Sequence, residues 1–182
     1  MIHVMCDLET LGRRPGCKLL SIGAVVFGPK GLGAEFYEEV KINHQGDLTA
    51  DQSTIDWWNQ QSPEARDRLY GGQDVKPTLR MALEKFNAWL EQLAMRDQKG
   101  NLELCLWGNG ADFDNAILQV AFDKTTMEQP AWPFWNNRCY RTLKNLAPSV
   151  KLVRQGVYHN ALDDAKSQAE HAVRLMDQLK AW

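Results

Sequence analysis

The stretch MCDLETLG at residues 5–12 places two carboxylates two positions apart at the end of an apolar run. Ile2 and Val4, within that run, are residue types that buried strands favour. Because side chains alternate along a strand, Asp7 and Glu9 are expected to lie on the same face. Two like charges at the edge of a core repel each other, and each resists leaving water. The pair is therefore either an exposed strand end or a site that binds a cation.

Two further regions carry carboxylates where one element ends and another begins. Asp112 and Asp114 lie where an apolar strand gives way to a helix, and Asp163 and Asp164 begin the last helix. Helical spacing sets Asp163 on a polar face, whereas Asp164 heads a row that continues through Gln168 into apolar residues. We therefore expect Asp164 to lean toward the protein and Asp163 toward water. Taken singly, an aspartate at a helix start is usually a cap or a partner of the helix dipole.

The carboxylates taken together favour a metal site over separate structural roles. His159 on its own is typical of a surface or hydrogen-bonded histidine, and no cysteine or histidine cluster occurs in the sequence. Oxygen ligands from the ends of separate elements suit hard divalent cations. The joint pattern predicts that Asp7 and Glu9 bind metal.

Three motifs resemble the DEDDh exonuclease superfamily, and they span residues 7–164 in the order found there. They are Asp7-x-Glu9, Phe113-Asp114 and His159-x-Ala161-x-x-Asp164. The resemblance implies a ribonuclease-H-like fold, Mg²⁺ or Mn²⁺ as cofactor (two ions), and 3′→5′ hydrolysis that releases nucleoside 5′-monophosphates. In the second motif that superfamily places its acid directly after phenylalanine, which selects Asp114 over Asp112.

The resemblance also assigns roles to five residues. Asp7, Glu9, Asp114 and Asp164 would bind metal, with Asp7 bridging the two ions, and His159 would be the general base. An imidazole with an ordinary pKa near 6.5 suits proton removal from water around neutral pH. A glycine three residues before His159 predicts a loop that can adjust when substrate binds.

A narrower resemblance links the chain to phage exonuclease A and related prophage exonucleases. It rests on STIDWWNQQSPEAR at residues 53–66 and FWNNRCYRTL at residues 134–143. Those relatives commonly carry an acidic residue where this chain has Cys139-Tyr140. The narrower resemblance favours single-stranded DNA over RNA, with the 3′ end of a single-stranded nucleic acid as the partner.

Substrate contacts are expected next to the metal motif. By analogy, Thr10 and Leu11 would contact the last sugar and base, together with His159. The aromatic residues that either stack on a base or belong to the core are Phe113, Trp57 and Trp58. The basic residues that either bind phosphates or form a solvated surface are Arg13, Arg14, Lys18, Arg138, Arg141 and Lys144.

The elements that must position these residues follow from periodicity and turn chemistry. Strands are predicted at 18–28 and 34–42, joined by the turn sequence GPKGLG, and a further strand at 102–108. Helices are predicted from Ser62-Pro63 onward and at 78–95, 114–124, 140–148 and 161–179, with a loop at 126–137. This order predicts one α/β domain over residues 1–182. Its mixed sheet has three antiparallel strands followed by parallel strands, flanked by helices.

Composition sets the class of protein. The chain has 182 residues, 44% hydrophobic and 24% charged, which fits one globular domain. A net charge of −2 gives no general attraction to nucleic acid, so a local patch or a metal must supply it. The scattered cysteines predict reduced thiols, and the absence of a signal peptide or long apolar span predicts a cytoplasmic protein that binds no membrane. The cysteines are Cys6, Cys17, Cys105 and Cys139. A homodimer is compatible with the sequence.

Two other function classes compete with the exonuclease. A ribonuclease-H-like endonuclease would use the same metals, but the spacing from His159 to Asp164 disfavours it. A non-catalytic nucleic-acid-binding module would tolerate loss of a ligand or the base, whereas this chain retains all five residues.

Overall fold

Five strands form a mixed sheet in the computed structural model, which describes residues 1–95, 103–126 and 128–182. The strands are β1 (Ile2–Thr10), β2 (Leu19–Gly28), β3 (Gly31–Glu39), β4 (Leu104–Gly108) and β5 (Asn137–Cys139), in the spatial order β3-β2-β1-β4-β5. β1, β2 and β3 form an antiparallel meander, whereas β4 pairs parallel with β1 and β5 pairs parallel with β4. The predicted mixed α/β sheet is confirmed.

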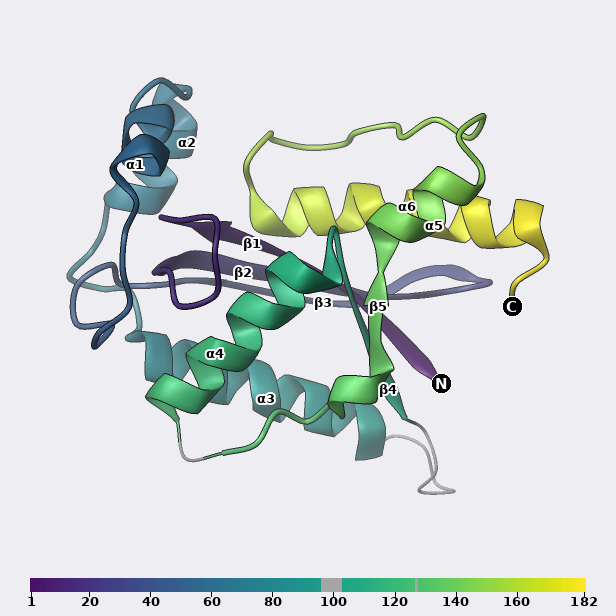
Figure 1. Cartoon of the computed structure of the whole chain (residues 1–182), viewed down its shortest axis with the longest axis horizontal. Helices are drawn as coiled ribbons and strands as arrows, with labels where there is room; N and C mark the ends of the chain where they lie inside the picture. The colour runs from purple at the N-terminus through teal and green to yellow at the C-terminus, as the bar shows by residue number, and fades with distance from the viewer. Residues whose placement is uncertain (96–102, 127) are drawn as a thin grey trace.

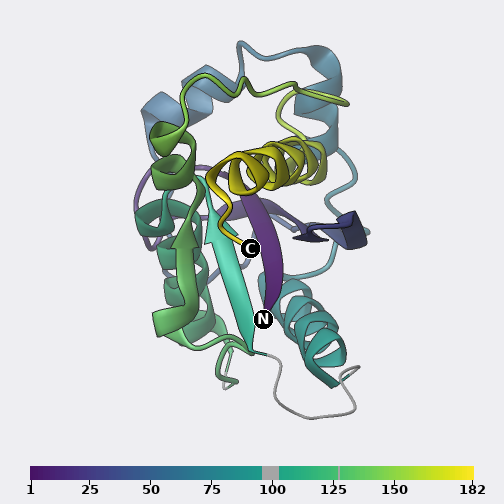
Figure 2. The same ribbon diagram turned by 90° about the vertical axis from the view of Figure 1, so that its right-hand side faces the viewer.

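Helices cover both faces of the sheet (Figures 1 and 2). They are α1 (Gln52–Trp58), α2 (Pro63–Tyr70), α3 (Leu79–Met95), α4 (Ala116–Thr125), α5 (Tyr140–Leu146) and α6 (Ala161–Leu179), with short helical turns η1 (Ala111–Asn115) and η2 (Phe134–Asn136). α3 and α4 lie on one face, α5 and α6 on the other, and α1 and α2 stand at the end of the sheet where β1 finishes. In the described residues, no helix is long and apolar enough to cross a membrane.

Alternation along β1 decides which face each side chain reaches. Val4, Cys6 and Leu8 belong to the core cluster that contains the apolar side of α3, whereas Met5 belongs to the cluster that contains α6. Asp7 and Glu9 continue the series of Met5, so they lie on the α6 face of the sheet. The predicted common face of the two carboxylates is confirmed.

The start of α6 lies unusually close to the sheet. Gly23 of β2 is paired with Asp7 of β1, and a Cβ atom at Gly23 would lie 2.2 Å from the backbone of Ala161. A side chain at position 23 would therefore push away the first turn of α6. Because position 23 is glycine, Asp164 and Gln168 of α6 can reach the strand that carries Asp7.

Several predicted boundaries are confirmed. The last helix spans 161–179 as predicted, and α3 buries the predicted apolar positions Leu79, Leu83, Phe86, Leu90 and Leu93. Ser62 caps α2, because its hydroxyl accepts a hydrogen bond from the backbone N–H of Ala65.

Other boundaries differ from the prediction. β3 runs from Gly31 to Glu39, because Gly31 pairs with Gly28 and the turn shrinks to the two residues between them. The helix predicted at 114–124 begins at Ala116, since a π-helical turn at Ala111–Asn115 precedes it. The loop predicted at 126–137 contains η2 and the first residue of β5, and the predictions at residues 102 and 127 lie outside the described residues.

Candidate active site

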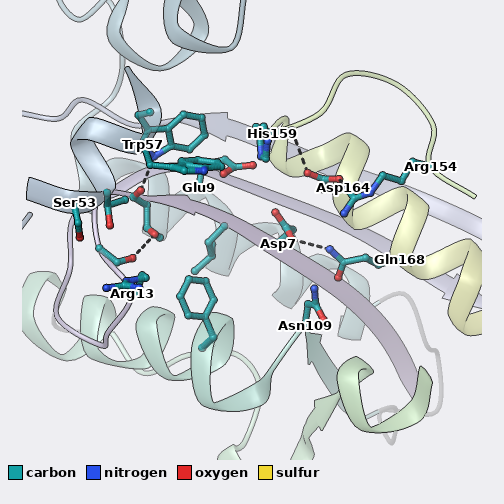
Figure 3. Close-up of a pocket in the computed structure, with 16 residues that line it drawn as sticks. Asp7, Glu9, Arg13, Ser53, Trp57, Asn109, Arg154, His159, Asp164 and Gln168 are labelled. Carbon is teal, nitrogen blue, oxygen red and sulfur yellow. Dashed lines mark hydrogen bonds and ion pairs between the residues drawn. The ribbon is translucent and has the colours of Figure 1, made fainter. Parts of the chain in front are cut away.

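A pocket of about 450 Å³ opens at the C-terminal end of β1 (Figure 3). Its walls come from β1, from α1, from the start of α6 and from the chain that leads into α6. Asp7, Glu9, His159 and Asp164 all line it. The structure thus brings together side chains that are more than 150 positions apart in the sequence.

β1 supplies the first two carboxylates. An oxygen of Asp7, Oδ1, accepts a hydrogen bond of 2.7 Å from Nε2 of Gln168. The Gln168 side chain is 5% exposed, and its Oε1 atom has no hydrogen-bond partner in the described part of the chain. Gln168 was placed by helical spacing on the inward row of α6, but the sequence did not mark it as a site residue. Its only signal is a position one helical turn after Asp164.

α6 and the segment that leads into it supply the next two groups. His159 has a positive φ of 60°, and its backbone N–H donates to Oδ2 of Asp164 over 3.3 Å. Glu9, His159 and Asp164 each offer one ligand atom, and these atoms lie within 4.8 Å of one another. Two carboxylates and an imidazole at this separation can share one metal ion.

Asp114 approaches Asp7 from η1, the turn that follows β4, although it is not among the residues that line the pocket. Its side chain is 2% exposed, and Oδ2 accepts a 2.8 Å hydrogen bond from the backbone N–H of Asn109. Asp112, the alternative in the second motif, is exposed to solvent on the outside of the turn. The buried position of Asp114 agrees with its selection over Asp112.

Burial raises the pKa values of all four carboxylates, and repulsion from neighbouring carboxylates adds to the shift at Asp7 and Glu9. Burial raises the pKa of Asp7 well above its usual value, with further contributions from the charges of Asp114, Glu9 and Asp164. Burial raises the pKa of Glu9 to about 8, and Asp164 and Asp114 add to that shift. Burial also raises the pKa of Asp114 to about 7, and it raises the pKa of Asp164. A site of this kind favours a bound cation, which would relieve the repulsion.

The pKa of His159 is shifted in the opposite direction. Burial lowers its pKa, and the charge of Arg154 lowers it further while Asp164 opposes the shift. The imidazole ring lies edge-on to Trp57 and Trp58, with ring centroids 4.8 and 5.7 Å away. A neutral imidazole at physiological pH can accept a proton or bind a metal ion.

The chain between α5 and α6, residues 147–160, is called the strap and crosses the outer side of α6 (Figure 1). Asp163 was expected to face water, but its Oδ2 accepts a 2.8 Å hydrogen bond from the backbone N–H of Val157. Ser167, one helical turn after Asp163, is 1% exposed, and its hydroxyl oxygen accepts a hydrogen bond from the backbone N–H of Gln155. The strap thus covers this side of the helix at Asp163 and Ser167, so the expectation was wrong for Ser167 and holds only in part for Asp163, which is half-buried.

The predicted substrate contacts divide into residues that reach the pocket and residues that do not. Thr10, Trp57 and Phe113 line it, and Trp57 is 42% exposed. Leu11 packs in a small core cluster with Trp58, away from the pocket lining. Trp58 is among the residues that line the pocket but is 1% exposed, and its indole N–H donates to the Thr10 carbonyl. Burial therefore favours the core alternative for Trp58 and leaves Trp57 as an accessible ring.

The predicted basic residues also divide into those at or beside the pocket and those elsewhere. Arg13 lines the pocket, and Arg141 donates a 2.6 Å hydrogen bond to the carbonyl of Asn109, which lines it as well. Arg138 instead donates to the carbonyl of Trp135. Arg154 of the strap lines the pocket and forms an ion pair with Asp164. Arg154 could not be identified from the sequence, because the strap has no helical or strand periodicity.

Comparison with known proteins places this geometry in context. The chain is 25% identical over 164 residues to an exodeoxyribonuclease of Enterobacteria phage T4, covering 78% of this chain and 70% of that protein. Its fold is similar to the nuclease domain of 3′hExo, described as a DEDDh family member bound to rAMP, with a TM-score of 0.63 and 15% identity over 97% of this chain and 92% of that one. It is also similar to E. coli Exonuclease I in complex with a dA16 oligonucleotide, with a TM-score of 0.65 and 13% identity over 98% of this chain and 43% of that one.

Both structural likenesses show the fold, and the family follows from the sequence itself. The family model described as the 3′-5′ exoribonuclease Rv2179c-like domain matches residues 2–176. That match spans β1 through most of α6, so it includes all three carboxylate motifs. The chain belongs to this family and is a 3′–5′ exonuclease.

Proposed function

We propose that the pocket removes nucleotides from the 3′ end of single-stranded DNA and releases nucleoside 5′-monophosphates. Residues 1–182 act as one exonuclease domain in this proposal. The observation that carries it is the convergence of Glu9, His159 and Asp164 within 4.8 Å, beside the buried carboxylates of Asp7 and Asp114.

Asp7, Glu9, Asp114 and Asp164 would hold two Mg²⁺ or Mn²⁺ ions. The donor set fits such ions, because it is rich in oxygen and carries more negative charge than its buried position tolerates alone. When bound, the ions lower the pKa of a water molecule and stabilise the leaving 3′ oxygen. Gln168 holds Asp7 through Nε2, and its Oε1 is buried without a hydrogen-bond partner in the described part of the chain.

His159 acts as the general base in this proposal. Its lowered pKa keeps the ring neutral near pH 7, so the ring can take a proton from the attacking water. Its hydrogen bond to Asp164 ties the backbone of the base to a metal ligand. The exposed face of Trp57 and the backbone around Thr10 supply the surface for the terminal nucleotide.

RNA is the second candidate substrate, because the family description names an exoribonuclease while the phage relative is an exodeoxyribonuclease. Digestion of 5′-labelled DNA and RNA oligonucleotides of one sequence separates the two. We expect faster shortening of DNA from the 3′ end, in a ladder with single-nucleotide steps. Faster digestion of RNA would replace the substrate class and leave the proposed site intact.

A circular single-stranded DNA of the same sequence tests the reaction type. A 3′ exonuclease leaves the circle uncut, whereas a ribonuclease-H-like endonuclease opens it. A binding module would retain both substrates without cleavage. Cutting of the circle, or binding without cleavage in Mn²⁺, would overturn the proposed reaction.

We also infer a cytoplasmic location, because all four cysteines lie in the described part of the chain and are free thiols. Fractionation of cells that produce the tagged chain tests this. The homodimer stays a prediction, which the mass measured by light scattering during gel filtration would check.

A further inference from the structure

Arg154 reaches the candidate metal site from a backbone that is fixed on its C-terminal side. The next residue, Gln155, donates its backbone N–H to Oγ of Ser167 over 3.0 Å and its side-chain amide to Glu170 over 2.6 Å. Val157 donates to Asp163. These contacts fasten the strap to α6. The Arg154 side chain can therefore change its partner while the backbone beside it stays fastened to α6.

The Arg154 guanidinium places its positive charge beside Asp164, where a bound cation would also place its charge. Arg154 Nη1 pairs with Oδ1 of Asp164, while Oδ2 of the same carboxylate accepts the backbone N–H of His159. Both oxygens of Asp164 thus have partners within the protein alone. The Asp164 side chain is 13% exposed, so a divalent ion that approaches it meets the arginine charge at close range.

The Arg154 side chain also has a second contact, with the ring of Tyr158. Arg154 is 43% exposed, and its guanidinium carbon lies 5.1 Å from the ring centroid of Tyr158, which is itself 62% exposed. The tyrosine ring forms a platform along which a planar guanidinium can slide. Because Arg154 also lines the pocket, a guanidinium released from Asp164 remains within reach of a phosphate bound there.

We propose that Arg154 is an internal counter-ion of the metal site, which pairs with Asp164 until an ion binds and is then released to a phosphate of the nucleic-acid substrate. This inference rests on the proposed metal-binding role of Asp164. It assigns two partners to one arginine, first Asp164 and then a phosphate. Arg154 therefore weakens metal binding in the free enzyme and strengthens substrate binding in the metal-loaded enzyme.

Calorimetric titration of the full chain with Mn²⁺ tests the first partner. Arg154→Gln should bind Mn²⁺ roughly three- to tenfold more tightly than the wild type, since it removes a competing positive charge. Arg174→Gln is the matched control, because Arg174 is an exposed arginine on α6 whose loss changes the net charge equally. The control should bind Mn²⁺ like the wild type.

The substrate arm uses steady-state hydrolysis of a single-stranded oligonucleotide at several salt concentrations with saturating Mn²⁺. Arg154→Gln should raise KM roughly tenfold. It should also reduce the slope of log KM against log salt concentration by about the amount that one phosphate contact contributes. Arg174→Gln should change neither.

The outcomes separate the inference from the function beneath it. Equal or weaker Mn²⁺ binding by Arg154→Gln, with normal binding by the wild type, overturns the counter-ion and leaves the metal site standing. An unchanged KM and salt slope overturns the transfer to phosphate. A wild-type protein that binds no Mn²⁺ overturns both the metal site and the inference.

Discussion

The site is assembled from two regions of unlike construction. The first region, called the sheet edge, comprises the C-terminal ends of β1 and β4 with the turn η1, and it carries Asp7, Glu9 and Asp114. The backbone of β1 and β4 is hydrogen-bonded to neighbouring strands, and η1 follows β4 closely. The strap, which carries Arg154 and His159, has no ladder and is fastened to α6 by side-chain hydrogen bonds. The sheet edge therefore fixes the carboxylates, and the strap presents one side chain that can change its partner and one that can accept a proton.

A second anchor holds the strap at its other end. Oη of Tyr140 and Nδ1 of His171 are 2.6 Å apart, and Nε2 of His171 lies 2.9 Å from the carbonyl of Val150. Because a carbonyl only accepts, Nε2 donates to it and Nδ1 accepts from the tyrosine hydroxyl. The difference between the two regions predicts that changes at the sheet edge abolish metal-dependent chemistry, whereas changes in the strap affect proton transfer and positioning.

The largest effect is expected at the sheet edge. Asp7→Asn, Glu9→Gln and Asp114→Asn, together with Asp164→Asn on α6, should each lower hydrolysis by roughly 10³-fold or more, since each removes a metal ligand. The variants should remain folded, because replacing one of several like charges relieves repulsion. Rates on labelled oligonucleotides and circular dichroism measure the two properties.

Asp112→Asn is the matched control for that series, because Asp112 is exposed and lies two positions from Asp114. It should retain activity. An inactive Asp112→Asn beside an active Asp114→Asn would reverse the assignment of the second motif.

Removal of the base from the strap should have the next largest effect. His159→Ala should lower kcat by about 10²–10⁴-fold, the usual range for a positioned acid–base group, with a smaller change in KM. The acidic limb of the pH–rate profile should also change, since it reports the protonation of this ring. An unaltered kcat would exclude His159 from proton transfer.

Displacement of the strap should cost less than loss of the base. Gly156 has a φ of +71°, and a Cβ there would lie 2.3 Å from Cγ of Asp163. Gly156→Ala should therefore shift the strap and lower kcat by roughly 10–100-fold with Mn²⁺ binding retained. Gly46→Ala matches its backbone strain, because Gly46 has a φ of +61° with no heavy atom of the described chain within 4 Å of a Cβ. Equal kcat losses in the two variants would contradict a positioning role of the strap.

The smallest effect concerns stability of the metal-free protein against pH. The folded pKa values of Glu9, about 8, and Asp114, about 7, lie above the ordinary values of 4.5 and 3.8. At these two carboxyls the folded state therefore binds more protons than the unfolded state between about pH 4 and about pH 8, so their contribution to stability falls as pH rises through that window. In EDTA the melting temperature should be lower at about pH 8 than at about pH 5.5. Asp7→Asn should flatten this slope, and a slope of opposite sign would contradict the buried carboxylate cluster.

The sequence predicted most of the sheet edge, because its signals are local. The two-residue period of β1 placed Asp7 and Glu9 on one face, and the period of α6 turned Asp164 toward them. Asp114 was selected only through the family resemblance. It lies in a π-helical turn, where the 100° step of an α-helix does not apply.

The strap could not be predicted in the same way. Its conformation depends on contacts between residues 6 to 15 positions apart, such as Val157 with Asp163 and Gln155 with Glu170, which follow no repeating pattern. The ion pair of Arg154 depends on that conformation, and so does the burial of Ser167. Leu11 shows a related limit, because the turn after β1 directs its side chain into a core cluster rather than into the pocket.

The central claim, that the converging carboxylates form one metal site, is tested most directly by the melting temperature in Mn²⁺. An ion that binds only the folded state at a hundred times its Kd adds about 2.7 kcal/mol of stability, or roughly 5–10 °C for a chain of this size. The wild type should show a saturable rise of this order that EDTA reverses. Asp7→Asn should lose most of the rise yet melt no lower than the wild type in EDTA. An equal Mn²⁺ shift in both proteins would mean that the ion binds elsewhere and would contradict the four-carboxylate site.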